Sequence, residues 1–299
     1  MATSCQITTP TDVKIKKIAM LTDFSENAGV ALHYAATMAR EYGAMLVLAH
    51  AYLPPGYAYA APEVAMVYQA FEDFRKSLEN RLLDQTEAAY LRDIKCSVVL
   101  HEGTPIELLE DLEDIDLIVV GTFGGTGLEK AVLGSTAEMV FRTATVPVLT
   151  VGPHCHSSNA GKSTPGTVLY ATDFSDGAAL AVPYALSVAQ KHDAELMLLH
   201  VVEDKDVEFS FERSMASAEP REKLHSLMPD DIELKHKPRY AVGFGEPDVV
   251  ILEEANKHNA ELIVLSARGA GSLACHFAEG TAYKVVAHAK CPVLTIRRN

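Results

Sequence analysis

The amino-acid sequence repeats itself, and this internal repeat constrains the fold more than any other feature. The segment 18–51, which reads IAMLTDFSENAGVALHYAATMAREYGAMLVLAHA, is closely similar to the segment 168–201, which reads VLYATDFSDGAALAVPYALSVAQKHDAELMLLHV. Further along, LIVVGTFGGTG beginning at Leu117 corresponds to LIVLSARGAGS beginning at Leu262. A chain of 299 residues with two such copies is expected to form two domains of one kind, each long enough to bury its own core.

The segment between the two copies has the composition of a linker. It reads GPHCHSSNAGKSTPG and is rich in glycine, serine and proline, as exposed connections are. We therefore expect a first domain at residues 1–151, an exposed linker at 152–166 and a second domain at 167–299.

Each copy alternates between short apolar runs and amphipathic segments. In the first copy the pattern predicts five strands, at residues 18–22, 45–51, 95–100, 117–120 and 146–151. It predicts helices from Ser25, as the N-cap, to Gly43, and at residues 64–93, 106–112 and 135–144. Such alternation indicates an α/β fold with a parallel sheet covered on both faces, whose ligand lies at the carboxyl ends of the strands.

The longest of these predicted helices carries an apolar stripe. Apolar side chains recur at helical spacing at Val67, Phe71, Phe74, Leu78 and Leu82. This pattern is typical of a helix with one apolar face directed at the core.

Glycine and hydroxyl residues follow the fourth predicted strand, at Gly121, Gly124, Gly134, Ser135 and Thr136. Glycines there allow a ligand to approach the backbone, and the free N–H groups at a helix start suit a phosphate. Ser135 and Glu138 also fit a capping box, which would explain the same residues by local structure. The residues alone leave both interpretations open.

Four features together resemble the universal stress protein family in its tandem form. They are TDFS after the first strand, a second strand ending in LAHA or LLHV, Gly103-Thr104-Pro105 before a short helix, and the spacing G-x2-G-x9-G-S before VPVLTV. The resemblance covers residues 16–151 and 167–297. It implies two Rossmann-like domains, each a five-stranded parallel sheet of order 3-2-1-4-5 with helices on both faces.

The resemblance also implies an adenine nucleotide as ligand, namely ATP with or without a divalent cation. By position, Asp23 would contact the adenine amino group and the backbone of Ala51 the adenine ring, while Val120 and Gly121 would lie on the ribose side. The phosphates would be held by Gly124, Gly134, Ser135 and Thr136.

The second copy matches the phosphate motif less well. In an ungapped register Gly134 becomes Glu279, and a glutamate beside phosphates would repel them, so this register predicts weak or no binding of triphosphate. A one-residue insertion in the loop would instead restore Gly280 and Thr281 as the Gly-Ser pair. The residues of this doubtful second site are Asp173, Val201, Gly269, Gly280 and Thr281. The match of the later helix residues favours the ungapped register and one site per chain.

Composition excludes several classes of function. The 26 basic and 40 acidic residues give a formal net charge of −14, which opposes nucleic-acid binding and attraction to anionic lipid. No apolar run approaches the length of about 18 residues that spans a bilayer, and no apolar leader is visible. The 5 cysteines are scattered without a C-x-x-C pair, which suits a reducing compartment. We therefore expect a cytoplasmic protein that binds neither nucleic acid nor membranes.

Other polar residues have ordinary structural explanations. His50 and His200 close buried strands and are interpreted as core histidines with satisfied hydrogen bonds. The tripeptide His-Cys-His at 154–156 offers adjacent ligands only, whereas structural zinc needs four at wider spacing, so no metal site is predicted. The acidic stretch 102–116, which contains no basic residue, is interpreted as a solvated face.

Three functions are compatible with these observations. The first is a stress-response protein in which ATP in the first domain is a regulatory or structural ligand, with the domains pairing through their fifth strands as an intrachain pseudo-dimer and with homodimers also open. The second is a slow ATPase or phosphotransferase, because Lys130 could reach a phosphate, although no catalytic residue is assigned. The third is an interaction module without nucleotide.

Overall fold

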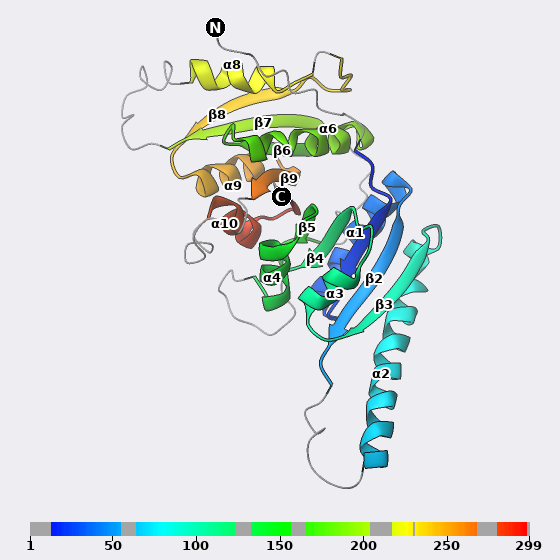
Figure 1. Cartoon of the computed structure of the whole chain (residues 1–299). Helices are drawn as coiled ribbons and strands as arrows, with labels where there is room; N and C mark the ends of the chain where they lie inside the picture. The colour runs from blue at the N-terminus through cyan, green and yellow to red at the C-terminus, as the bar shows by residue number, and fades with distance from the viewer. Residues whose placement is uncertain are drawn as a thin grey trace. The chain divides into compact units, whose positions relative to one another are not determined.

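The computed structural model describes residues 13–54, 64–122, 133–156, 166–203, 217–229, 231–267 and 280–297. The chain divides into two compact units (Figure 1), one formed by Ile15–Ala160 and the other containing Gly161–Asn299. We call them the first and the second domain and describe each by itself.

The first domain is built on a parallel sheet. Its strands are β1 (Lys17–Leu21), β2 (Met45–Tyr52), β3 (Cys96–Glu102), β4 (Leu117–Gly121) and β5 (Val148–Val151). They lie in the order β3-β2-β1-β4-β5, and each neighbouring pair is parallel. The central strands β1 and β4 are almost entirely buried, as their short apolar runs predict. The α/β fold and the strand order expected from the sequence are confirmed.

Helices connect these strands. They are α1 (Glu26–Tyr42), α2 (Val64–Thr86), α3 (Pro105–Asp111) and α4 (Ser135–Thr143), with a 3-10 helix at Ala89–Leu91. The limits of α1 follow from local chemistry: Ser25 is its N-cap, and Gly43 ends it in the left-handed conformation with φ of 65°. Both ends were predicted from the sequence and are confirmed.

The apolar stripe of α2 is buried only in part. Leu78 and Leu82 are buried against the sheet, whereas Phe74 keeps 38% of its surface exposed. Figure 1 shows the reason, since the C-terminal part of α2 lies beside β3 while its N-terminal part extends past the sheet. The stripe is therefore buried at Leu78 and Leu82 and exposed in part at Phe74, and Val67 lies outside the residues whose side chains are described. None of the helices in the described ranges is both long and apolar enough to cross a membrane.

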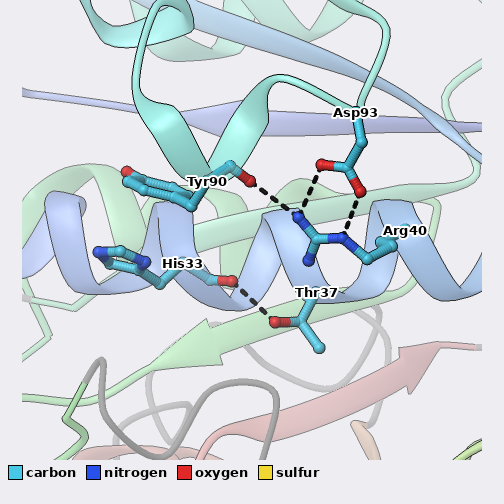
Figure 2. A network of polar contacts seen from close by, with 5 residues as sticks. All are labelled: His33, Thr37, Arg40, Tyr90 and Asp93. Carbon is cyan, nitrogen blue, oxygen red and sulfur yellow. Dashed lines mark hydrogen bonds and ion pairs between the residues drawn. The ribbon is translucent and has the colours of Figure 1, made fainter.

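The chain leaves the helical path earlier than residue 93, where the sequence predicted the end of α2. Figure 2 shows the contacts that hold the following turn against α1. The guanidinium of Arg40 donates to both carboxylate oxygens of Asp93, at 2.6 and 2.9 Å, and to the carbonyl of Tyr90 at 2.8 Å. The rings of His33 and Tyr90 stack with their centroids 3.9 Å apart. These tertiary contacts replace the last helical turns.

The beginning of the predicted linker is not exposed along its whole length. The side chain of Cys155 is buried, which raises the pKa of its thiol to about 11. The hydroxyl of Tyr34 in α1 donates to the carbonyl of His156 at 3.2 Å. Residues 152–156 therefore belong to the first domain, and the expectation of an exposed linker is wrong at Gly152 and Cys155, whereas Pro153, His154 and His156 are exposed.

The second domain repeats the architecture. Its strands are β6 (Thr167–Thr172), β7 (Glu195–Val202), β8 (Arg239–Phe244), β9 (Ala260–Ala267) and β10 (Val293–Arg297). Their order β8-β7-β6-β9-β10 is again 3-2-1-4-5, with parallel pairs throughout. Its helices are α5 (Asp176–Ala179), α6 (Val182–Lys191), α8 (Ala218–Ser226), α9 (Pro247–Lys257) and α10 (Thr281–His288).

The first helix of this domain is broken where α1 is continuous. Pro183 has no N–H to donate to the carbonyl of Ala179, so the helix cannot continue through that point without losing a hydrogen bond. The hydroxyl of the buried Tyr170 donates to the carbonyl of Ala178 at 2.8 Å. A side chain from β6 thus adds a second donor to the carbonyl of Ala178, which also accepts from the N–H of Ala181 at 2.9 Å at the break between α5 and α6.

Candidate functional site

The turn after β1 positions Asp23, the first of the predicted site residues. The N–H of Ser25 donates to Oδ1 of Asp23 at 2.9 Å, and the N–H of Phe24 donates to Oγ1 of Thr22 at 3.0 Å. The hydroxyl oxygen of Ser25 accepts from the N–H of Ala28 at 3.1 Å and so caps α1. Phe24 has a φ of 63°, a conformation that costs a bulky residue energy and that must be held by its surroundings. Asp23 therefore lies exposed at the carboxyl end of β1 in a defined turn.

The second domain repeats this turn bond for bond. The N–H of Ser175 donates to Oδ1 of Asp173 at 3.0 Å, and the N–H of Phe174 donates to Oγ1 of Thr172 at 3.0 Å. The Ser175 hydroxyl oxygen accepts from the N–H of Ala178 at 3.2 Å, and Phe174 has a φ of 59°. The TDFS motif thus specifies one local structure in both domains.

A histidine near the end of the second strand supports each turn. Nδ1 of His50 lies 2.7 Å from the carbonyl oxygen of Thr22, and Nδ1 of His200 lies 2.8 Å from that of Thr172. Because a carbonyl only accepts, each Nδ1 carries the proton and donates. Each ring also packs on the phenylalanine of the turn, with centroids 4.6 and 4.4 Å apart. The prediction of satisfied hydrogen bonds is confirmed at Nδ1 of both histidines, whereas both side chains are only partly buried.

Helix α4 begins at the carboxyl end of β4. Its N-cap is Gly134, whose N–H donates to the carbonyl of Thr122 at 2.5 Å. No side chain in the described part of the chain caps this helix start, and Glu138 pairs instead with Arg142 at 2.6 Å. The capping box of Ser135 and Glu138 is therefore wrong: Ser135 is the first helical residue, and the first-turn N–H groups have no such cap.

Gly121 at the end of β4 has a packing reason to be glycine. A Cβ atom there would lie 2.9 Å from Nδ2 of Asn27 and 3.3 Å from the backbone of Asn27. The Asn27 amide itself donates to the carbonyl of Val151 at 3.4 Å. The start of α1 thus approaches β4 so closely that a side chain at 121 would displace it.

The described residues of the predicted first site come from one edge of the parallel sheet. Asp23 follows β1, and Ala51 lies near the end of β2. Gly121 ends β4, and Gly134 is the N-cap of the helix after β4. The side chain of Val120 is 3% exposed, so a contribution to ligand binding must come from its backbone. Gly124 and Lys130 lie outside the described residues.

The second domain has the same kind of helix start. Helix α10 has Gly280 as its N-cap, with φ −69° and ψ 141°, close to the −60° and 155° of Gly134. The carbonyl of Gly280 accepts the first helical bond, from Lys284 at 3.1 Å. Here too no side chain among the described residues caps the helix.

This geometry decides between the two registers of the second motif. The helix ends agree without a gap, because Ala144 and Ala289 are the two C-caps, but α10 has 8 residues where α4 has 9. Gly280 therefore has the N-cap role that Gly134 has in the first domain, and Thr281, like Ser135, is the first helical residue. The ungapped register expected from the sequence is wrong at the helix start. Gly269 lies outside the described residues, while Asp173 and Val201 lie at the ends of β6 and β7.

The second domain has no glycine at the position that corresponds to Gly121, and the residue that would face this position differs as well. Ser266 stands where the first domain has Gly121, and Gly177 stands where it has Asn27. A Cβ atom on Gly177 would lie 4.0 Å from Cβ of Ser266, which is an ordinary contact. The small and the larger residue have exchanged places, so Ser266 fits without opening the start of α5.

Acidic residues in the stretch 102–116 also form hydrogen bonds and an ion pair that stabilise the local structure. A carboxylate oxygen of Glu107 accepts from the Thr104 N–H at 2.6 Å in a capping box, which lowers the pKa of Glu107. Asp111 pairs with Nδ1 of His101 at 2.9 Å, and Asp116 accepts from the Lys16 N–H at 2.7 Å. No group of three His, Cys, Asp or Glu residues within the described ranges is arranged to hold a metal ion.

Sequence reasoning missed two neighbours of the site. The guanidinium of Arg81 in α2 lies 4.0 Å from the centre of the Phe24 ring, and Asn27 packs on Gly121. Nothing local marks Arg81, because α2 is far from the turn in sequence. Asn27 is marked only by the paired difference between the two copies.

Comparison with known proteins agrees with this architecture. The model of the universal stress protein family matches residues 14–152 and 165–297, which together cover both domains. The chain belongs to the universal stress protein family. The family resemblance inferred from the motifs is thereby confirmed, including its tandem form.

Relatives include one-domain and two-domain universal stress proteins. The Thermus aquaticus universal stress protein in QAH/OAS sulfhydrylase 3'region is 35% identical over 136 residues, which cover 44% of this chain and 98% of the relative. Universal stress protein Rv2623 of Mycobacterium tuberculosis is 26% identical over 294 residues, which cover 93% of this chain and 95% of the relative. The second relative spans both domains.

A solved structure of a universal stress protein from Archaeoglobus fulgidus has the same fold. The two structures superpose with a TM-score of 0.68 at 23% identity, covering 95% of this chain and 98% of the other. At this identity the likeness concerns the fold alone.

Proposed function

We propose that the first domain binds an adenine nucleotide, ATP, as a regulatory or structural ligand in a stress response. The phosphates lie at the start of α4, near Gly134, Ser135 and Thr136, and the base lies between Asp23 and Ala51 at the ends of β1 and β2. Val120, Gly121 and Gly124 complete the site, and a divalent cation accompanies the triphosphate.

The start of α4 is the observation that carries this proposal. Helix N-termini attract anions because their first N–H groups lack partners and lie at the positive end of the helix dipole. With glycine as N-cap and Glu138 engaged by Arg142, no described side chain competes for these donors. The N–H of Gly134 fixes the helix start to the end of β4, where ligands of such sheets bind.

The base end is supported by the turn after β1. Oδ1 of Asp23 is fixed by the N–H of Ser25, so the carboxylate has a defined direction at the sheet edge. A carboxylate there accepts hydrogen bonds from an exocyclic amine such as the 6-amino group of adenine. Family membership supports an adenine nucleotide over other anions.

We propose a second nucleotide site in the second domain. The observation that favours it is the cap of α10, where Gly280 and Thr281 take the positions of Gly134 and Ser135. The sequence predicted one site per chain because Glu279 was expected at the helix start. Since the N-cap is Gly280, we propose two sites per chain. Asp173, Val201 and Gly269 would complete this site.

We further propose a cytoplasmic protein whose two domains pair through their fifth strands as a pseudo-dimer. Two cysteines of the described residues, Cys96 and Cys155, are free thiols, which supports a reducing compartment. The test of pairing is the oligomeric state of the isolated first domain at high concentration, because a strictly monomeric domain would contradict it.

Calorimetry of the full chain with ATP tests the first-domain site. Gly134→Asp places a carboxylate at the N-cap, where it satisfies the helix donors and repels phosphate, so we expect loss of that site without loss of stability. Gly134→Asn is the matched control, because asparagine caps equally well without charge and should retain more affinity. Unchanged affinity of Gly134→Asp would contradict the proposal. Single-turnover phosphate release distinguishes a bound ligand from a slow ATPase.

A further inference from the structure

The environment of His50 contains more than a satisfied core histidine needs. Its Nδ1 donates to the carbonyl of Thr22 at 2.7 Å, and Thr22 immediately precedes Asp23. Ala51 immediately follows His50. One hydrogen bond therefore joins the two strand ends that carry the proposed contacts to the base.

Phe24 connects this hydrogen bond to a nearby cation. The Phe24 ring lies 4.6 Å from the His50 ring, and the guanidinium of Arg81 lies 4.0 Å from the centre of the Phe24 ring. A phenylalanine with a φ of 63° keeps that conformation only where packing enforces it. His50 and Arg81 supply such packing, so the direction of Asp23 depends on both.

The charge state of His50 follows from its surroundings. Burial lowers the pKa of its imidazole below the ordinary 6.5, and the positive charge of Arg81 lowers the pKa further. The hydrogen bond to Thr22 and the charge of Asp23 act in the opposite direction. Among the described residues these are the charged groups that face His50. The imidazole is therefore neutral above pH 6.5, with the proton on Nδ1.

We propose that His50 is a positioning residue of the nucleotide site and that only its neutral form holds Asp23 and Ala51 in the arrangement that binds the base. This inference rests on the proposed function of the first domain. Protonation at Nε2 keeps the bond from Nδ1–H to Thr22 but adds a second positive charge in a half-buried setting near Arg81, and repulsion between the two cations loosens the packing on Phe24. Acid therefore weakens binding at the base end without any change in the phosphate end.

The experiment measures affinity of the full chain at pH 7.5 and pH 5.5 by calorimetry. All proteins carry Asp173→Ala and Gly280→Asp, which remove the proposed base contact and the proposed phosphate contact of the second domain, so that only the first domain is measured with either probe. ATP is one probe, and adenosine is the other because it has no phosphate group that titrates in this range. Because the pKa of His50 lies below 6.5, its protonated form exceeds its neutral form by less than about tenfold at pH 5.5, so we expect adenosine affinity to fall at pH 5.5 by at most about tenfold.

Two substitutions at His50 separate positioning from packing. His50→Asn keeps an amide donor near the position of Nδ1 and does not titrate, so it should bind at pH 7.5 like the parent and lose the fall at pH 5.5. His50→Phe keeps a ring without the donor and should bind more weakly at both pH values. His200→Asn is the matched control in the second domain and should leave the parent profile unchanged.

The outcomes are distinguishable. If the parent fails to bind ATP and adenosine at pH 7.5, the proposed function fails and this inference fails with it. If the parent binds and His50→Asn shows the same fall at pH 5.5, the inference about His50 is overturned while the nucleotide site stands. Full affinity of His50→Phe would overturn it as well.

Discussion

The two domains keep the same turn and helix starts while their packing contacts differ. Asp23 and Asp173 accept equivalent hydrogen bonds, and Gly134 and Gly280 cap equivalent helices. By contrast, α1 is one helix where the second domain has two, broken next to Pro183. The elements around the proposed ligand are thus constant, and the supporting structure varies. This pattern is expected where the ligand constrains the strand ends and packing alone constrains the rest.

The cation over the turn also differs between the domains. In the first domain Arg81 lies 4.0 Å from the Phe24 ring centre, and no carboxylate of the described residues pairs with it. In the second domain Lys223 lies 5.7 Å from the Phe174 ring centre and pairs with Glu219 at 2.7 Å. The cation thus lies nearer to the phenylalanine ring of the turn in the first domain than in the second.

The largest effect on stability is expected at the contact between Gly121 and Asn27, whose counterparts in the second domain are Ser266 and Gly177. Gly121→Ser in the first domain forces its side chain against Asn27 and should cost about 1–3 kcal/mol of unfolding free energy. Asn27→Gly removes the obstacle but lowers helix propensity by about 0.3 kcal/mol. The double substitution should cost less than the sum of the single ones, as measured by chemical denaturation of all four proteins. If the two costs are additive, the contact with Asn27 does not explain why residue 121 is glycine.

The next effect concerns the start of the helix after the third strand. Thr104 caps α3 in a capping box, whereas Glu246 at the start of α9 makes no side-chain cap. Thr104→Ala should cost about 0.5–2 kcal/mol of unfolding free energy, and Glu246→Ala should change it by less than about 0.5 kcal/mol. Thermal or chemical denaturation measures both, and equal effects would contradict the difference between the two caps.

A smaller effect is expected at the break between α5 and α6. Tyr170→Phe removes the hydroxyl that donates to the carbonyl of Ala178 and should cost about 0.5–1.5 kcal/mol. Burial raises the pKa of Tyr170 to about 12, so the hydroxyl stays protonated and the cost should not vary across neutral pH. Met20, the counterpart in the first domain, has no polar atom to lose, and Met20→Leu is the conservative control. If Tyr170→Phe does not change the free energy of unfolding, the hydroxyl of Tyr170 does not stabilise the break between α5 and α6.

The smallest expected effect is a shift in titration. Arg81→Gln removes a nearby positive charge and should raise the pKa of His50, which nuclear magnetic resonance of the imidazole protons measures. The folded-state pKa of His50 lies below its unfolded value of 6.5, so its contribution to stability is complete above pH 6.5 and is lost as the pH falls. Arg81→Gln should therefore reduce the loss of stability on acidification. An unchanged or lower pKa of His50 in Arg81→Gln would show that the charge of Arg81 does not lower this pKa.

Features set by neighbouring residues could be predicted from the sequence, and features set by distant contacts could not. Ser25 and Gly43 fix the ends of α1 through local hydrogen bonds and backbone conformation, so both ends were predicted correctly. The start of α4 at Ser135 was predicted as well, but the capping box of Ser135 and Glu138, one of the two local interpretations, does not form, because the N–H of Gly134 fixes the helix start through a bond to the distant Thr122. The register of the second motif failed for the same reason, because helix residues downstream agree without a gap while the cap does not.

The central claim is that glycine-capped helix starts in both domains hold nucleotide phosphates, and the number of ATP molecules bound per chain tests it most directly. Calorimetry should find two sites in the parent, one after Gly134→Asp, one after Gly280→Asp and none in the double variant, with all four proteins folded. A parent with one site that survives Gly134→Asp, or two sites that survive both substitutions, would contradict the claim.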